Sequence, residues 1–137
     1  MEMPLEKQVV SLELSKELKE TGYPQKGLWA WYSATDRDDE PRLTWADENS
    51  SMCALRKQAF EEKFVAPTVA ELGKALPNKI KCVVGEAKLF IQKDDNGYFV
   101  YYAKQLDHIA IVYSEIADTE ANCRAKIYIC LKKQGLL

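Results

Sequence analysis

An asparagine–glycine pair between two β-rich runs is the feature that most constrains the fold of this chain. The runs are AKLFIQK and YFVYYAK, and DDNG joins them. Asparagine and glycine both tolerate the positive φ of a type I′ turn, which connects antiparallel strands. We therefore predict a hairpin with Asn96 and Gly97 as its two turn residues, in which Ile91 faces Tyr102.

Both faces of this hairpin are rich in apolar side chains. One face is predicted to carry Leu89, Ile91, Val100 and Tyr102, and the other Phe90, Phe99, Tyr101 and Ala103. An antiparallel sheet with one face in water alternates apolar and polar residues instead. We therefore expect other parts of the protein to pack against both faces.

Periodicity and capping residues place the remaining elements. Strands are expected at 28–34, 42–45, 79–84 and 108–113, and helices at 11–22, 52–62, 68–76 and 119–134. The helix at 68–76 begins with a capping box formed by Thr68 and Glu71 and is stopped by Pro77. Ser11 is expected to cap the first helix, and Asp118 or Thr119 the last one.

This element order predicts an α+β fold. We expect an antiparallel sheet of about four to six strands with helices packed on its faces, similar to an α-β-α sandwich. With 137 residues, the chain has the length of one domain, spanning 1–137.

Charge is unevenly distributed along the chain. The net charge is −2; residues 1–66 hold 9 basic and 13 acidic side chains, whereas residues 67–137 hold 10 and 8. The basic residues of the C-terminal half include Lys79, Lys81, Lys88, Arg124, Lys126, Lys132 and Lys133. A dedicated nucleic-acid binder usually has a stronger basic excess.

The order of elements from residue 68 onward, helix, strands, helix, is related to that of double-stranded-RNA-binding domains. In those domains a lysine cluster lies at the start of the last helix, where this chain has Asp118 and Glu120. Carboxylates at that position repel phosphate. A nucleic-acid-associated module that uses the basic C-terminal half is therefore the alternative interpretation.

Cysteine and histidine usage argues against metal sites. The chain has four cysteines, at 53, 82, 123 and 130, and one histidine, His108. No paired-cysteine spacing typical of zinc sites is present. We expect reduced thiols, no metal and no cofactor. No apolar segment has the length of a signal peptide or a membrane span, so we expect a cytoplasmic location without membrane contact.

No catalytic motif is recognisable. Asp107 and His108 are adjacent, so in a strand they point to opposite faces. Phosphate-binding glycine loops and nucleophile elbows are absent. The acidic clusters DRDDE and DDNG are interpreted as a solvated loop and a turn. We expect no catalytic residues, and the protein is predicted not to be an enzyme.

The tryptophans are the candidate partner surface. Trp29, Trp31 and Trp45 lie in or next to the hairpin expected at 28–45, and the chain also has seven tyrosines. Tryptophan and tyrosine are favoured at protein interfaces because they bury a large area at a low entropy cost. The alternative is that these rings belong to the core.

Three segments carry a resemblance to a known group. They are VVSLELSKELKETGYPQKGLWAWY, APTVAELGKALP and ADTEANCRAKIYICLKKQGL. Together they resemble small uncharacterised proteins encoded by phages and prophages of anaerobic gut bacteria. The last segment is also similar to the phage α-β-α sandwich domain. The resemblance implies an accessory protein of a phage or prophage in a bacterial cytoplasm. We expect it to act without catalysis, through contact with a protein partner.

Overall fold

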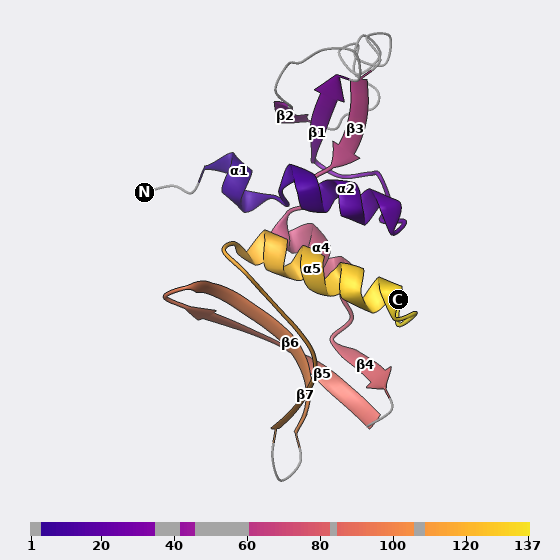
Figure 1. Ribbon diagram of the computed structural model, residues 1–137, viewed down its shortest axis with the longest axis vertical. Coiled ribbons are helices and arrows are strands. Elements are labelled where there is room, and N and C mark those ends of the chain that lie inside the picture. The colour runs from indigo at the N-terminus through magenta and orange to yellow at the C-terminus, as the bar shows by residue number, and fades with distance from the viewer. Residues whose placement is uncertain (1–3, 35–41, 46–60, 83–84, 106–108) are drawn as a thin grey trace. The chain divides into compact units, whose positions relative to one another are not determined.

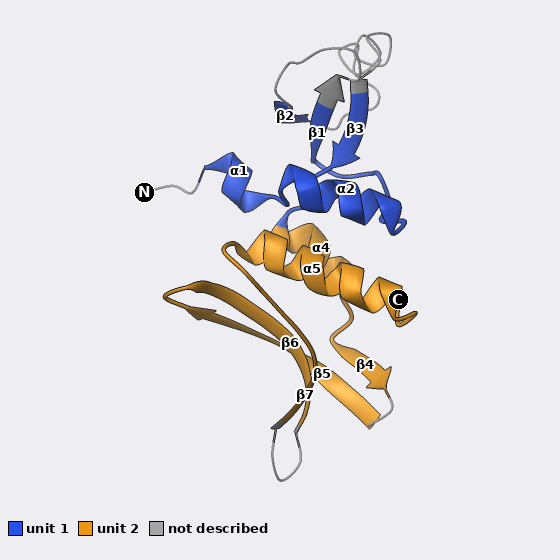
Figure 2. Cartoon of the chain, in the orientation of Figure 1, with its two compact units in different colours: residues 1–68 blue, residues 69–137 orange. Residues whose placement is uncertain are grey.

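The computed structural model describes residues 4–34, 42–45, 61–82, 85–105 and 109–137. The chain forms two compact units, residues 1–68 and residues 69–137, which are coloured separately in Figure 2. Each unit has its own helices and its own antiparallel sheet (Figure 1). The expectation of a single domain over 1–137 stays a prediction, for which unfolding is the test.

Unit 1 combines short helices with a sheet in the strand order β2-β1-β3. Its described elements are α1 (Leu5–Gln8), α2 (Leu12–Glu20), β1 (Trp29–Ala34), β2 (Arg42–Trp45) and β3 (Glu61–Val65). The predicted start of α2 is confirmed, because the Ser11 hydroxyl accepts a hydrogen bond from the Leu14 amide at 3.4 Å. The predicted pairing of 28–34 with 42–45 is also confirmed, as β1 and β2.

Strand β3 was not predicted from the sequence, and neither was the four-residue helix α1. Strand β3 pairs with β1 in antiparallel register, with Phe64 opposite Trp31 and Val65 opposite Ala30. The helix predicted at 52–62 lies mostly outside the described residues. At its last two positions, Glu61 and Glu62, the prediction is wrong, since these residues begin the strand. The backbone hydrogen bonds that β1 offers there outweigh the weak local preference of the charged sequence EEKFV.

Unit 2 consists of a four-stranded antiparallel sheet, in the order β4-β5-β6-β7, and two helices. Its described elements are α4 (Val69–Ala75), β4 (Lys79–Cys82), β5 (Gly85–Asp94), β6 (Gly97–Gln105), β7 (Ile109–Ala117) and α5 (Glu120–Lys133). The predicted α+β class is confirmed. The strands belong to two sheets, because β1 pairs with β2 and β3 only, and β4 to β7 pair among themselves.

The hairpin between β5 and β6 forms, but its turn lies one residue earlier than predicted. Asp94 pairs with Gly97, so the turn residues are Asp95 and Asn96, and Ile91 faces Val100 instead of Tyr102. The Asp94 carboxylate accepts a hydrogen bond from the Asn96 amide at 2.8 Å, which stabilises the shifted turn.

A close backbone approach explains the place of Gly97. Its φ is +136°, and a Cβ atom there would lie 2.4 Å from the Ala117 carbonyl oxygen on β7. Only glycine fits in the first position of β6 without displacing β7. The shifted turn changes the cross-strand partner of each residue by two positions. Because side chains alternate with a period of two, every side chain stays on the face predicted for it.

Helix α5 covers one face of the unit 2 sheet. The Cys123 thiol donates hydrogen bonds to the carbonyls of Tyr98 and Glu115, at 3.4 and 3.1 Å. Val100 and Tyr102 lie on this face, and both are fully buried. Of the two residues expected to cap α5, Asp118 and Thr119, the structure uses Thr119, whose hydroxyl accepts a hydrogen bond from the Asn122 amide.

The opposite face of this sheet was expected to be covered as well, and in the described part of unit 2 no helix covers it. Its aromatic rings pack against one another instead, and Ile111 and Ile116 on β7 are 51 % and 67 % exposed. The residues that lie on this face were predicted correctly, but the prediction that another part of the protein packs on them is not borne out by the described part of unit 2.

Candidate functional site

Two of the three predicted tryptophans form a stacked pair. Trp29 on β1 and Trp45 on β2 are directly opposite in the strand register. Their ring centroids are 4.3 Å apart with an interplanar angle of 21°. The Trp45 side chain is 60 % exposed, although Trp29 supports one side of its ring. The pair therefore presents a large apolar surface that is already held in one orientation.

The position of Trp45 follows from the alternation of the strands. On β1, Ala30 and Tyr32 point to the opposite face from Trp29, and both are buried. β2 is an edge strand of only four residues, so its side chains have a neighbouring strand on one side only. A large aromatic ring that is exposed at a sheet edge is a candidate contact site.

Trp31 lies on the same side of β1 as Trp29 but has a structural role. Its indole Nε1 donates a hydrogen bond to the Val10 carbonyl oxygen at 3.0 Å, and the side chain is half-buried. This bond ties the segment before α2 to the sheet. The structure therefore brings Trp29 and Trp45 together and uses Trp31 as an anchor.

A second aromatic group in unit 1 lies under lysines. The Nζ atoms of Lys16 and Lys19 on α2 lie 5.5 and 4.9 Å from the centroid of the Phe64 ring. They line an open pocket of 460 Å³ together with Glu20 and Glu62. Lys19 also donates to the Lys63 carbonyl oxygen at 3.1 Å. These cation–π contacts join α2 to β3.

Sequence reasoning did not find this pocket because it did not find β3. The helix predicted at 52–62 leaves Phe64 outside any element. The local sequence carries no strand signal, because EEKFV reads as three charged residues followed by two apolar ones and does not alternate with a period of two.

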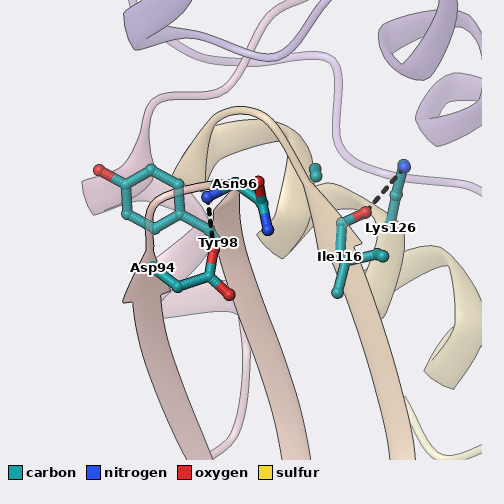
Figure 3. A pocket seen from close by; sticks show the side chains of 7 residues that line it. Asp94, Asn96, Tyr98, Ile116 and Lys126 are labelled. Carbon is teal, nitrogen blue, oxygen red and sulfur yellow. Dashed lines mark hydrogen bonds between the residues drawn. The ribbon is translucent and has the colours of Figure 1, made fainter.

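A pocket of 490 Å³ in unit 2 lies where the β5–β6 turn meets the end of β7. Figure 3 shows its two charged side chains, Asp94 and Lys126, on opposite sides of the hollow. Lys126 donates to the Ile116 carbonyl oxygen at 2.9 Å, and Asp94 accepts from the Asn96 amide (Figure 3). The Lys126 and Asp94 side chains are each hydrogen-bonded to a backbone group. The two charged groups therefore do not point at a common position where a reacting atom could lie.

The buried thiols and phenols of unit 2 are held in their neutral forms. Burial raises the pKa of the Cys123 and Cys130 thiols above the usual range. A neutral thiol is a poor nucleophile. Burial also raises the pKa of Tyr102 to about 12, against the opposing effect of the Arg124 charge. The Tyr102 hydroxyl donates to the Pro77 carbonyl oxygen at 2.6 Å, so it locks the end of the α4 segment to the sheet.

Chemical groups for metal binding do not gather in the described residues. No cluster of three or more His, Cys, Asp or Glu side chains in that part of the chain has the geometry of a metal site. Asp107, His108 and Cys53 lie outside the described residues, as does the acidic stretch at 36–40. In the part of the chain that is described, no helix is long and apolar enough to cross a bilayer.

Comparison with known proteins finds no match. No protein-family model, no curated protein and no solved structure is similar to this chain at a significant level. The functional interpretation therefore rests on the geometry of the two units.

Proposed function

We propose that this protein is a non-enzymatic binding protein that contacts a protein partner through Trp45 and Trp29. The observation that carries the proposal is the stacked pair itself, with Trp45 60 % exposed at the edge strand β2. Tryptophan is enriched among the few residues that dominate the energy of an interface.

The rigidity of the pair supports this role. Trp45 is restrained by the Trp29 ring and by its place on a strand, so its side chain has little freedom left to lose on binding. Both indoles are large, and such residues contribute most when a partner excludes water from them.

The setting of the proposal comes from the sequence resemblance. We propose this role for an accessory protein of a phage or prophage in the cytoplasm of a bacterial host. The raised pKa values of the Cys123 and Cys130 thiols, which keep both thiols neutral, agree with a protein that does not use them as nucleophiles.

Nucleic acid is the second candidate partner, and a different observation favours it. On the sheet face of unit 2 that α5 does not cover, three aromatic rings stack next to exposed lysines. This second role uses the basic C-terminal half of the chain and does not require the tryptophan pair.

The test is an affinity capture of bacterial-lysate proteins by the tagged full chain, after nuclease treatment of the lysate. Three versions are compared: wild type, Trp45→Ala and Trp31→Phe. We expect a protein retained by wild type and by Trp31→Phe and lost with Trp45→Ala. For a purified partner, the affinity should fall roughly 30-fold or more with Trp45→Ala, as for a dominant interface residue.

Trp31→Phe is the matched control, because it alters a tryptophan on the same face whose indole is engaged inside the protein. Retention that does not depend on Trp45 would place the contact elsewhere. Retention that disappears with nuclease would contradict a protein partner and favour the second candidate.

A further inference from the structure

The uncovered face of the unit 2 sheet has a defined composition. The strand register places Lys79, Lys81, Lys88, Phe90, Phe99 and Tyr101 on one side of β4, β5 and β6. We call these six residues the ring face. On β7, Ile116 lies opposite Phe99 and extends the same side as far as the sheet edge. Helix α5 packs on the other side, against the face that carries Tyr102.

The rings of this face form a continuous stack across two strands. The centroids of Phe90 and Tyr101 are 5.3 Å apart with an interplanar angle of 16°, and those of Phe99 and Tyr101 are 4.8 Å apart at 26°. Tyr101 is therefore the middle ring. Its hydroxyl accepts a hydrogen bond from the Gln92 amide at 3.1 Å, which fixes the ring in place.

The outer rings are the accessible ones. Tyr101 is only 7 % exposed, whereas Phe90 and Phe99 are half-buried, and the exposed side chain of Ile116 continues the apolar surface. A flat aromatic group from a ligand can extend the stack at either outer ring. An aliphatic chain would gain less from this parallel arrangement of rings.

Exposed lysines stand beside the rings. Lys88 lies two residues from Phe90 on the same face of β5, about 7 Å along the strand. Lys81 is exposed on the neighbouring strand β4. Within the described residues no ion pair joins Lys81 or Lys88 to a carboxylate.

Two carboxylates lie on this face. Glu86 is directly opposite Lys81 in the strand register and four residues from Phe90 along β5. Glu86 forms a salt bridge with Lys79 at 3.4 Å, so these two charges offset each other. Asp94 lies at the turn end of β5, six residues along the strand from Lys88. Lys88 therefore places a positive charge next to the Phe90 ring, whereas Lys81 lies farther from the rings, on the edge strand and opposite Glu86.

We propose that the ring face binds single-stranded nucleic acid, with bases stacked on Phe90 and Phe99 and a phosphate near Lys88. Single strands offer flat bases and negative phosphates in alternation, which matches rings and lysines at neighbouring positions. In a duplex the bases are already stacked on one another, so no base face is free to stack on the rings. This inference deepens the second candidate function and is independent of the tryptophan pair.

A second copy of the chain fits this face less well. Two-fold symmetric packing of one ring face on another brings β4 either over β4 or over β7 of the other copy. The first arrangement sets lysines against lysines. The second sets Lys79 and Lys81 against the exposed isoleucines of β7, Ile111 and Ile116. Neither pairs the charges.

The experiment is fluorescence anisotropy of labelled oligonucleotides of about 12 nucleotides, a length within ordinary single-strand site sizes. Single-stranded RNA, single-stranded DNA and a duplex of the same sequence are titrated with the full-length protein at several salt concentrations. The RNA and DNA arms show which single strand is preferred. Sedimentation of the protein alone measures self-association.

Two kinds of variant separate rings from charges. Phe99→Leu keeps an apolar side chain in the sheet but removes the ring, and it should weaken single-strand binding roughly 5- to 150-fold with an unchanged salt slope. Lys88→Glu should weaken binding and make the slope of log affinity against log salt shallower by about 0.7, the value for one lost phosphate contact. Phe90→Leu serves as the second ring variant if Phe99→Leu does not fold.

Matched controls make the outcome decisive. Lys133→Glu changes the net charge by the same amount at an exposed position near the end of α5, and it should leave the affinity unchanged within about twofold. Trp45→Ala should also leave it unchanged, which separates this inference from the tryptophan proposal.

Several results would overturn the inference. They are the absence of binding at low salt, an equal affinity for duplex and single strand, and equal losses of affinity with Lys88→Glu and Lys133→Glu. Competition by an acidic peptide as effective as that by the oligonucleotide would point to a charge-only surface. A dimer broken by Phe99→Leu would identify a second copy as the occupant.

Discussion

Two surfaces of this protein are built from aromatic residues on strands, and they differ in what stands beside the rings. In unit 1, Trp45 stacks on Trp29 and stays 60 % exposed, while the lysines of α2 lie over a different ring, Phe64. In unit 2, the stack of three rings has exposed lysines on its own face. Both surfaces are aromatic, so the charged side chains next to the rings determine which kind of partner each surface suits.

The largest effect that we expect is a loss of stability in unit 2, and the tryptophans of unit 1 provide a reference signal. Gly97→Ala puts a Cβ atom 2.4 Å from the Ala117 carbonyl oxygen at a φ of +136°. We expect the free energy of unfolding to fall by roughly 3 kcal/mol or more, because strain and displacement of β7 add together. Urea unfolding followed by far-UV circular dichroism measures this.

Gly135→Ala is the control for that substitution. Gly135 also has a positive φ, +72°, but no atom lies within 4 Å of a Cβ placed there. Its loss should be about 1 kcal/mol, the cost of the left-handed conformation alone. A Gly97→Ala loss no larger than this would show that β7 does not constrain the turn.

The same experiment tests the single-domain prediction. All three tryptophans lie in unit 1, so their fluorescence reports on that unit, whereas circular dichroism reports on both. Coincident transitions by the two probes would support one cooperative domain. If Gly97→Ala shifts the dichroism transition and leaves the fluorescence transition in place, the two units unfold separately and the single-domain prediction is wrong.

A smaller loss of stability is expected for a substitution on the face of the unit 2 sheet that α5 covers. Tyr102→Phe removes the buried hydrogen bond to the Pro77 carbonyl oxygen on the α5 side and should cost about 1–2 kcal/mol. Burial raises the pKa of Tyr102 from 10.0 to about 12, so the unfolded chain loses this proton first as pH rises. The contribution is therefore fully present below pH 10 and is lost as pH rises through the folded-state pKa of about 12.

The measurement is the stability difference between wild type and Tyr102→Phe, taken at neutral pH and at several values above pH 10. We expect this difference to narrow as pH rises. A difference that stays constant would mean that the phenol titrates alike in both states, and hence that its burial does not hold it neutral. Oligonucleotide binding at neutral pH should not change, because Tyr102 lies on the face opposite the ring face.

The smallest losses of stability are expected for substitutions of Trp31 and Trp45 in unit 1. Trp31→Phe loses the indole hydrogen bond to the Val10 carbonyl and should lower the free energy of unfolding by about 1 kcal/mol. Trp45→Phe keeps a ring stacked on Trp29 and should change stability by no more than about 0.5 kcal/mol. Equal losses would contradict the division into an anchoring and a contacting indole; urea unfolding of both variants decides this.

Local sequence signals predicted the ends of elements well. Ser11 caps α2 as expected, and Thr119, one of the two residues expected there, caps α5, because a hydroxyl at this position satisfies a free amide of the first turn. The β5–β6 turn was displaced by one residue, since the close approach of Ala117 to Gly97 is a contact with a distant strand.

The candidate site was predicted only in part. Trp29, Trp31 and Trp45 were selected by residue type, but residue type does not distinguish a stacked exposed indole from one that is hydrogen-bonded inside the fold. Phe64 was missed together with β3, whose charged sequence becomes a strand because β1 supplies its hydrogen bonds.

The α+β class, the capped helices, the hairpins and the division of side chains between the two faces of β5 and β6 follow from the amino-acid sequence alone. These features depend on neighbours within a few residues, through capping, turn chemistry and the two-residue period of a strand. The tertiary structure was needed to establish that the described strands form two sheets, that α5 covers one face of the second and no described helix of unit 2 covers the other, and that Trp45 remains exposed. Those outcomes depend on which distant segments compete for the same hydrogen bonds and the same apolar surface, and no local pattern encodes that competition.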